Sequence, residues 1–279
     1  MDWTDWAVWV AIVALGVAAA LLLRLFRQNR RLRHLAAESE RLRLQTEATE
    51  QRNRQLKQEM TSNIAHELKT PVSSIRGYLE ILLGEHPVDD ERKRYYLERC
   101  YRQTLRLSDL VHDVSLINKA EESADLFPRR HEDVRAVAEE AVGELREKAD
   151  AAGITVADNL PQPMPLMGNH ELLYCIFRNL IENSVAYAGS GASVTIETYK
   201  ESPTHYYIHF YDTGAGVADE YLSKLFDRFL RIDEGRSRRR GGTGLGLSIV
   251  KHAVMFHGGE IYARNREGGG LEFFFSLKR

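Results

Sequence analysis

Hydrophobic positions at the start of the chain form one unbroken run. Residues 6–23 carry no charged side chain, and about 20 apolar residues are enough to cross the hydrocarbon of a bilayer. Two aspartates precede the run and five arginines follow it within residues 24–33, which by the positive-inside rule places the C-terminal side in the cytoplasm. A cleaved signal peptide would carry its positive charge before the run. The pattern predicts a single-pass transmembrane helix at residues 6–23, in contact with membrane lipid, with residues 1–5 outside; a buried core helix is the alternative.

The next segment, residues 24–55, is polar and helix-forming. Residues 28–60 are rich in Glu, Arg, Gln, Leu and Ala and contain neither Gly nor Pro, which favours one long helix. Steps of three and four residues produce a heptad seam whose middle positions are polar. The seam consists of Leu32, Leu35, Ser39, Leu42, Thr46, Thr49, Asn53, Leu56 and Met60. We expect a weak coiled coil that joins two copies of the chain into a rod; a solvated helical spacer is the alternative.

Residues 56–120 carry two stronger helical stripes. The first stops near Gly84 and the second begins beyond Pro87, so the stretch 84–90 is expected to connect two antiparallel helices. The stripes consist of Ile64, Leu68, Val72, Ile75, Leu79 and Leu82, and of Leu97, Cys100, Thr104, Leu107, Val111 and Val114. A single hairpin buries little apolar surface, whereas two hairpins bury both stripes in a four-helix bundle. The expected fold is an all-α hairpin that forms a four-helix bundle as a homodimer.

The pattern changes after residue 120. Residues 121–131 lack periodicity and contain a proline, so we predict a linker there. In residues 132–279 helical stretches alternate with strand-like ones, which predicts a mixed α/β domain. The expected helices are 132–150 and 169–187, and the expected strands are 153–157, 193–199, 206–211, 259–265 and 271–277.

Composition limits the classes of function. A chain of 279 residues allows roughly two compact domains, and 43% hydrophobic with 28% charged residues is ordinary for folded proteins. The net charge of −2 supplies no basic field for a nucleic-acid backbone, so nucleic acid is not expected as a partner. Cys100 and Cys175 lack Cys-x-x-Cys spacing, and no carboxylate or cysteine completes a metal set with His205 and His209 or with His252 and His257. A disulfide framework and a structural metal site are therefore not expected.

One cluster in the first hairpin helix has the residue types of a phosphate acceptor. His66 lies off the apolar stripe, so its imidazole is expected to face solvent. Neutral imidazole is nucleophilic near physiological pH, and the adjacent Glu67 can accept the released proton. Thr70 lies one turn further on. Pro71 removes the amide that would bond the carbonyl of Glu67, which bends the helix beside His66.

The segment from Ser62 to Pro71 resembles the H-box of sensor histidine kinases from bacterial two-component systems, whose core reads His-Glu-(Leu/Ile)-(Lys/Arg)-Thr-Pro. The resemblance implies that His66 is the autophosphorylated residue and that Glu67 assists the phosphotransfer. It also implies that Thr70 positions a hydrolytic water when the protein acts as a phosphatase on its partner.

Residues 179–183 look like the N-box of the same family. Asparagines at i and i+4 share one helix face, and an amide oxygen is a suitable ligand for Mg²⁺. The resemblance implies that Asn183 binds the Mg²⁺ that bridges the ATP phosphates, with Asn179 beside it, and that Tyr187 packs near the adenine. Many relatives have a Lys three positions after the second Asn, where this chain has Ala186. That phosphate contact is then expected from elsewhere in the chain.

Two further boxes follow in the family's order. Residues 212–217 look like the G1 box, in which an ionised Asp212 accepts a hydrogen bond from the exocyclic amine of adenine. Gly214 and Gly216 would let the backbone approach the base closely. Residues 226–229 resemble the F-box, which hinges the ATP lid, although apolar packing of a helix face is the alternative. The F-box residues are Phe226, Arg228 and Phe229.

Residues 241–248 resemble the G2 box and open an apolar helical stretch. Glycines at a helix start let consecutive amides converge on a phosphate. The segment is neither a Walker A loop nor a Rossmann fingerprint. The resemblance assigns ATP binding to Gly242, Thr243, Gly244, Leu245 and Gly246. Four arginines fall in the expected lid and either contact phosphate or form a solvated basic loop: Arg236, Arg238, Arg239 and Arg240.

The five boxes together imply a function for the whole chain. They imply a homodimeric kinase, anchored in the bacterial cytoplasmic membrane, that phosphorylates His66 from Mg²⁺-ATP and passes the phosphoryl group to an Asp of a cytoplasmic response regulator. For residues 132–279 they imply the two-layer α/β sandwich of gyrase-type (Bergerat) ATPases. The alternatives are a phosphatase-biased or non-catalytic scaffold and a gyrase-type ATPase clamp. With about five residues outside, the signal is expected from the bilayer, a membrane partner or the cytoplasm.

Overall fold

The computed structural model describes residues 3–84, 88–122, 127–232 and 242–279; at most positions of residues 3–37, and at a few others in helices, it describes the backbone alone. The chain divides into two compact units, Met1–Ser62 and Asn63–Arg279. The second unit contains the predicted hairpin and the predicted α/β domain.

The first unit consists of the N-terminal part of helix α1 (Trp3–Leu83). Its polar segment is stabilised along its own length, since Arg43 Nε donates to Glu47 at 2.9 Å and Thr46 Oγ1 donates to Leu42 O at 3.0 Å. Within the part of the chain that the structure describes, no helix is both long and apolar enough to cross a membrane. Most side chains of residues 6–23, and several of the heptad seam, lie outside the described residues. The transmembrane helix and the coiled coil therefore stay predictions.

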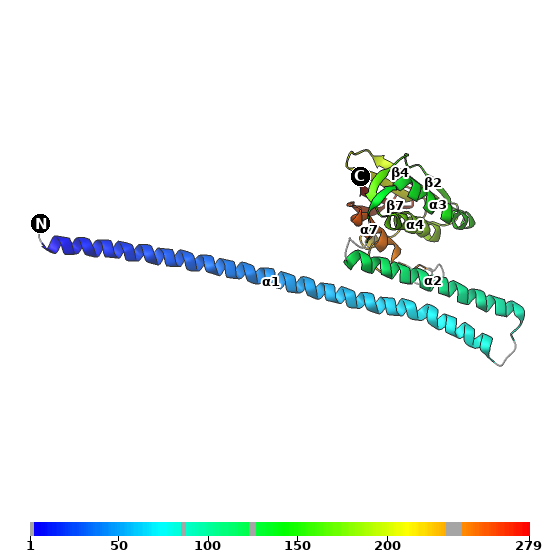
Figure 1. The fold of residues 1–279 in the computed structure, drawn as a ribbon, viewed down its shortest axis with the longest axis horizontal. Coiled ribbons are helices and arrows are strands. Elements are labelled where there is room, and N and C mark those ends of the chain that lie inside the picture. Colours follow the sequence, from blue (N-terminus) through cyan, green and yellow to red (C-terminus); the bar gives the residue numbers. More distant parts are fainter. Residues whose placement is uncertain (1–2, 85–87, 123–126, 233–241) are drawn as a thin grey trace. The chain divides into compact units, whose positions relative to one another are not determined.

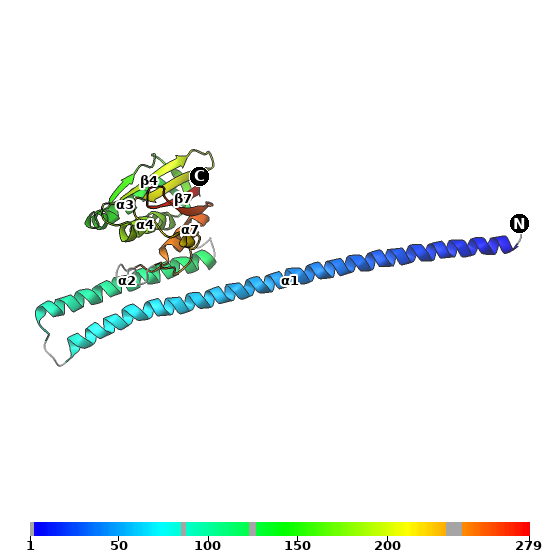
Figure 2. The ribbon, with the colours of Figure 1, turned by 180° about the vertical axis from the view of Figure 1, so that it is seen from behind.

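The second unit begins with a helical hairpin, as predicted. Figures 1 and 2 show α2 (Asp90–Glu122) beside the C-terminal end of α1. The two helices run antiparallel: Tyr78 stacks on Tyr96 with ring centroids 5.7 Å apart, and Cys100 Sγ lies 3.8 Å from the carbonyl oxygen of Ile75. α2 starts after Asp89, whose carboxylate accepts a hydrogen bond from the backbone N–H of Arg92 at 2.8 Å, as an N-cap does.

The α/β domain follows the hairpin and is the predicted two-layer sandwich. Its main sheet has the strand order β2-β4-β5-β7-β6, with β2 parallel to β4 and the other neighbours antiparallel. Figures 1 and 2 show the helices α3, α4 and α7 on one side of this sheet. The strands are β2 (Thr155–Asp158), β4 (Ser193–Lys200), β5 (His205–Asp212), β6 (Ile261–Asn265) and β7 (Leu271–Lys278). The helices are α3 (Val134–Ala151), α4 (His170–Tyr187), α5 (Asp219–Leu222) and α7 (Gly246–Phe256).

The core lies between the sheet and its helices. On β5 every second residue is buried, which is the alternation expected of a strand with one covered face. α4 buries an apolar stripe against the sheet, where Phe177 meets Phe275 of β7 with ring centroids 6.2 Å apart. Each fully buried side chain of this size contributes about 1.5–3 kcal/mol relative to its exposed state. The buried series on β5 ends at Asp212, so the strand's own alternation turns this carboxylate inward.

A small second sheet was missed by the sequence analysis. β1 (Arg130–Asp133) starts at the end of the predicted linker and pairs antiparallel with β3 (Pro165–Gly168). These four-residue strands have no apolar alternation strong enough to mark them. Their pairing is supported by Asp133, whose carboxylate accepts hydrogen bonds from Arg135 N and Met164 N, both at 3.0 Å.

Candidate functional site

The predicted acceptor histidine lies on the hairpin, in the part of α1 that belongs to the second unit. The His66 side chain is 68% exposed, as its position off the apolar stripe predicts, whereas that of Glu67 is only 17% exposed. His66 Nδ1 lies 3.9 Å from Glu67 Oε1, beyond hydrogen-bond range. One turn on, Thr70 Oγ1 donates to the carbonyl oxygen of His66 at 3.2 Å. An accessible imidazole therefore stands beside a shielded carboxylate.

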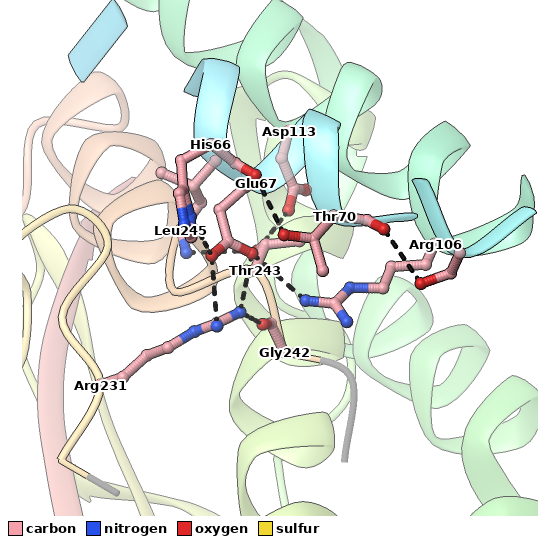
Figure 3. A network of polar contacts seen from close by, with 10 residues as sticks. His66, Glu67, Thr70, Arg106, Asp113, Arg231, Gly242, Thr243 and Leu245 are labelled. Atoms are coloured by element: carbon pink, nitrogen blue, oxygen red, sulfur yellow. Dashed lines mark hydrogen bonds and ion pairs between the residues drawn. The ribbon is translucent and has the colours of Figure 1, made fainter. Parts of the chain in front are cut away.

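The carboxylate of Glu67 is held by two guanidinium groups. Arg106 of α2 donates through Nη2 to Oε2 at 3.2 Å. Arg231, beyond the F-box, donates through Nη1 to Oε1 at 3.3 Å and through Nη2 to Oε2 at 3.2 Å. Arg231 also donates to the carbonyl oxygen of Gly242. Figure 3 shows these side chains converging on Glu67 from α2 and from the α/β domain. Bidentate pairs of this kind fix geometry as well as charge.

A second carboxylate of the hairpin contacts the glycine-rich turn. Asp113 Oδ2 of α2 accepts a hydrogen bond from Thr243 Oγ1 at 2.9 Å, and Thr243 Oγ1 accepts one from the N–H of Leu245 at 3.2 Å. Burial raises the pKa of Asp113 to about 6, against the lowering effects of the Thr243 hydrogen bond and of Arg178 and His112. This carboxyl group therefore changes its charge close to neutral pH.

The N-box residues lie on α4, one turn apart on one helix face. Asn179 Nδ2 donates to the carbonyl oxygen of Cys175 at 2.8 Å, and a side chain added at Gly246 would bring its Cβ within 2.5 Å of Asn179 Oδ1. Asn183 is partly exposed, and Tyr187, at the end of the helix, is 47% exposed. Both amides and the aromatic ring therefore lie along α4, and the Asn179 amide lies next to the start of α7.

Asp212 is a buried hydrogen-bond acceptor. It is 5% exposed, and its Oδ2 accepts from Ser184 Oγ of α4 at 3.1 Å. Its Oδ1 accepts from the backbone N–H of Gly214 at 2.9 Å and of Leu271 at 3.3 Å. An ionised carboxylate has about four acceptor positions, so three donors leave one for a further donor.

Glycines pack the turns around Asp212 tightly. Gly216 has a φ of 71°, and its hypothetical Cβ would lie 2.6 Å from Asn265 Oδ1. At Gly214 an added Cβ would lie 2.5 Å from the Cα of Ala188, so the loop after β5 touches the end of α4. A side chain at either position would have to displace its neighbours. The G1 glycines are therefore required by the fold of the turn itself.

The F-box and the G2 box meet in space. The backbone N–H of Phe229, which has a φ of 61°, donates to the carbonyl oxygen of Gly244 at 2.8 Å. Phe226 packs edge-on against Phe273 at 6.3 Å, and Arg228 Nη2 lies 3.4 Å from His252 Nε2 of α7. The four arginines predicted to lie in the lid, at positions 236 and 238–240, are outside the described residues.

α7 begins inside the G2 box. Leu245 is fully buried and precedes Gly246, the first helical residue. The helix start has no side-chain cap hydrogen bond, so its first amides are not used by a capping side chain. Amides at a helix start carry partial positive charge and favour anions. The structure therefore brings Asp212, the N-box face and a polar helix terminus to one edge of the α/β domain.

The sequence patterns did not mark several residues of this site as functional. They are Arg106, Asp113, Ser184, Arg231 and Gly270. Each acts on a partner far away in the sequence, and no local spacing marks such a contact. Gly270 alone carries a signal, because it belongs to a run of three glycines before β7.

Comparison with known proteins agrees with this arrangement. Residues 56–123 match the His Kinase A (phospho-acceptor) domain, and residues 168–279 match the domain described as histidine kinase-, DNA gyrase B-, and HSP90-like ATPase. The sensor-like histidine kinase SenX3 of Mycolicibacterium smegmatis is 32% identical over 221 residues, which are 79% of this chain and 57% of that protein. The chain belongs to the bacterial sensor histidine kinases.

Solved structures of the same fold extend over both domains. The histidine kinase AdeS of Acinetobacter baumannii superposes with a TM-score of 0.60 at 24% identity, over 76% of this chain and 97% of AdeS. The histidine kinase ThkA, solved in complex with the response regulator protein TrrA, gives a TM-score of 0.60 at 22% identity, over 79% of this chain and 61% of that one. The chain spans little more than half the length of its first curated relatives.

Proposed function

We propose that this chain is a protein-histidine kinase that phosphorylates His66 from Mg²⁺-ATP. The observation that carries the proposal is the exposed His66, with Glu67 beside it, in the same unit as an ATPase-type domain whose Asp212 is buried and pre-positioned. No other histidine of the described residues stands in such a setting on the hairpin: His112 lies 3.9 Å from Glu171 of α4.

The residues present fit Mg²⁺-ATP. Asp212 has one acceptor position left for the amine of adenine, and the uncapped start of α7 suits phosphate oxygens. Asn183 would supply an amide oxygen to Mg²⁺. When bound, Mg²⁺-ATP supplies the γ-phosphoryl group, with part of its charge neutralised by the metal.

The roles of the hairpin residues follow from which ring nitrogen faces the carboxylate. Nδ1 of His66 is the nitrogen near Glu67, so Nδ1 carries the proton and Nε2 presents its lone pair as the nucleophile. Nε2 would bond to the γ-phosphorus as the bond from that phosphorus to the β–γ bridging oxygen breaks and ADP leaves, and Glu67 would accept the Nδ1 proton. Because Glu67 lies 3.9 Å away and is paired with arginines, this step requires a change of side-chain partners.

Labelling with γ-labelled ATP tests the proposal. We expect acid-labile, base-stable label on the wild-type chain and none on His66→Gln. Asn183→Ala should lose labelling while keeping its fold, because the metal ligand is removed, whereas Asn118→Ala, an exposed amide on α2, should label normally. Equal labelling of His66→Gln and wild type contradicts the acceptor assignment, and ATP turnover without His66 labelling favours an ATPase clamp.

The same proposal extends to partners and location. The exposed apolar stripe of the hairpin supports a homodimer, in which two hairpins form a four-helix bundle. The complex of ThkA with TrrA supports transfer from His66 to an Asp of a response regulator. Thr70, exposed one turn after His66, supports a phosphatase reaction on that partner. The uncharged residues 6–23, with arginines after them, support a membrane anchor with the catalytic domains in the cytoplasm.

A further inference from the structure

Two carboxylates of the hairpin accept hydrogen bonds from residues of the α/β domain. Asp113 accepts from Thr243 Oγ1 at 2.9 Å, and Glu67 is paired with Arg231, which also bonds the carbonyl oxygen of Gly242. Figure 3 shows the two contacts side by side, with Thr243 and Gly242 of the α/β domain near the hairpin helices. Two residues that follow each other in the glycine-rich turn are thus tied to the two helices of the hairpin.

These contacts occupy the groups that catalysis needs. Both oxygens of Glu67 accept from guanidinium groups, and His66 Nδ1 remains 3.9 Å away. A carboxylate in this position cannot take the Nδ1 proton until Arg231 leaves it. Thr243, which the resemblance assigns to ATP binding, is likewise engaged by Asp113 rather than free to meet a ligand.

We propose that Asp113 is a positioning residue that docks Thr243 onto the hairpin, and that the docked form is a resting state in which Arg231 withholds Glu67 from His66. The inference rests on the proposed function, because it concerns release of the same acceptor site. Signals that separate Asp113 from Thr243 would then free Thr243 for nucleotide and Glu67 for proton transfer.

The charge of Asp113 sets how tightly the docked form is held. Its carboxylate is partly buried against Thr243, and the groups that face it are His112 and Asp109 on α2 and Arg178 on α4. Arg178 Nη2 lies 3.8 Å from Asp109 Oδ1. Burial disfavours the charged form of Asp113, whereas the Thr243 hydrogen bond and Arg178 favour it, so the carboxylate is a stronger acceptor for Thr243 than a neutral group would be.

A reversible cross-link tests the docking and its effect together. In the full chain with Cys100→Ser and Cys175→Ala, the pair Asp113→Cys and Thr243→Cys should form a disulfide under mild oxidation, because the side chains are in contact. We expect the oxidised protein to label His66 at least tenfold more slowly, roughly the scale of losing access to a catalytic base, and to recover on reduction. Thr243→Cys alone is the matched control, whose labelling oxidation should leave unchanged.

Two results overturn the proposal: failure of the cysteine pair to cross-link, and labelling of the cross-linked protein as fast as of the reduced one. A different result contradicts the proposed function instead. If the wild-type chain never labels His66, the kinase assignment fails, while disulfide formation in the cysteine pair still measures docking.

Two substitutions of Asp113 should both speed labelling, to different extents. Asp113→Ala removes the acceptor and should speed labelling about fivefold, the equivalent of one hydrogen bond of about 1 kcal/mol. Asp113→Asn keeps an acceptor oxygen without the charge, which weakens the hydrogen bond to Thr243, and should speed labelling by less than Asp113→Ala does. Glu98→Ala, further along α2 and paired only within that helix in the described residues, should change nothing. Labelling by Asp113→Ala at the wild-type rate or below it would refute the docking role.

Discussion

At the scale of single residues, His257 shows how the fold fixes a protonation state. It is 2% exposed, its Nε2 accepts a hydrogen bond from the backbone N–H of Asn169 at 3.1 Å, and its Nδ1 lies 2.7 Å from the carbonyl oxygen of Ala253. Only the neutral tautomer with the proton on Nδ1 satisfies both partners. Burial lowers the pKa of His257 to about 4 from its usual 6.5, and Arg129 adds to the effect.

Stability should therefore depend on pH through this histidine. The unfolded chain binds a proton at His257 below about pH 6.5 and the folded chain only near pH 4, so the stabilisation is complete above pH 6.5 and is lost as the pH falls. Between about pH 7.5 and pH 5 we expect a loss of roughly 2 kcal/mol in the free energy of unfolding. Urea titrations of wild type and His257→Gln at both pH values measure it. A difference between the two proteins that does not change with pH would contradict the assignment.

At the scale of elements, the turn between β6 and β7 is built against the end of β5. Gly268, Gly269 and Gly270 all have positive φ, and a Cβ on Gly270 would lie 1.9 Å from the carbonyl oxygen of Asp212. The turn also presents the N–H of Leu271 to Asp212 Oδ1 at 3.3 Å. The position of the Asp212 carboxylate thus depends on a turn about sixty residues further along the chain.

Alanine substitutions in this turn separate backbone strain from steric clash. Gly268→Ala meets nothing within 4 Å and should cost only about 1–2 kcal/mol for the left-handed backbone. Gly270→Ala has the same strain and the clash with β5, and should cost about 3 kcal/mol or more and weaken nucleotide binding. Urea unfolding and a fluorescent nucleotide titration check both variants. Equal costs at the two positions would mean that the turn moves away from β5.

At the scale of the whole molecule, the hairpin leaves apolar surface without a partner in the described chain. Val72 is 51% exposed, Leu97 57% and Leu105 48%. On α1 a shallow groove follows one helix face and is lined by Val72, Ile75, Arg76, Leu79, Glu80 and Leu83. Exposed apolar stripes on adjacent helices are the surfaces that a four-helix bundle buries.

A charge in this groove should therefore prevent dimerisation. Leu79→Asp places a carboxylate where the second hairpin is expected to pack, and we expect the sedimentation coefficient to fall to that of a monomer at micromolar concentration. Ser73→Asp, on the same helix but outside the groove lining, should remain dimeric. A wild-type chain that sediments as a monomer, or a Leu79→Asp variant that stays dimeric, contradicts the homodimer.

The sequence by itself determined the elements whose patterns are local. Helix stripes, strand alternation and glycine-bounded turns predicted the hairpin, α3, α4 and the five strands of the main sheet, within a few residues of their observed bounds. The motifs marked His66, Asn183, Asp212 and the glycine run as candidate site residues, and their roles stay predictions. Each of these signals is carried by neighbouring residues, because helix and strand periods and turn chemistry act over a few positions.

Only the tertiary structure decided which groups meet. The short strands β1 and β3 exist because they pair with each other, and their own sequences lack a periodic signal. Arg106, Asp113 and Arg231 are ordinary charged residues in the sequence, and they gain a role because folding brings α2 and the residues flanking the glycine-rich turn to Glu67 and Thr243. The choice of ion-pair partner depends on long-range packing, which spacing along the chain does not encode.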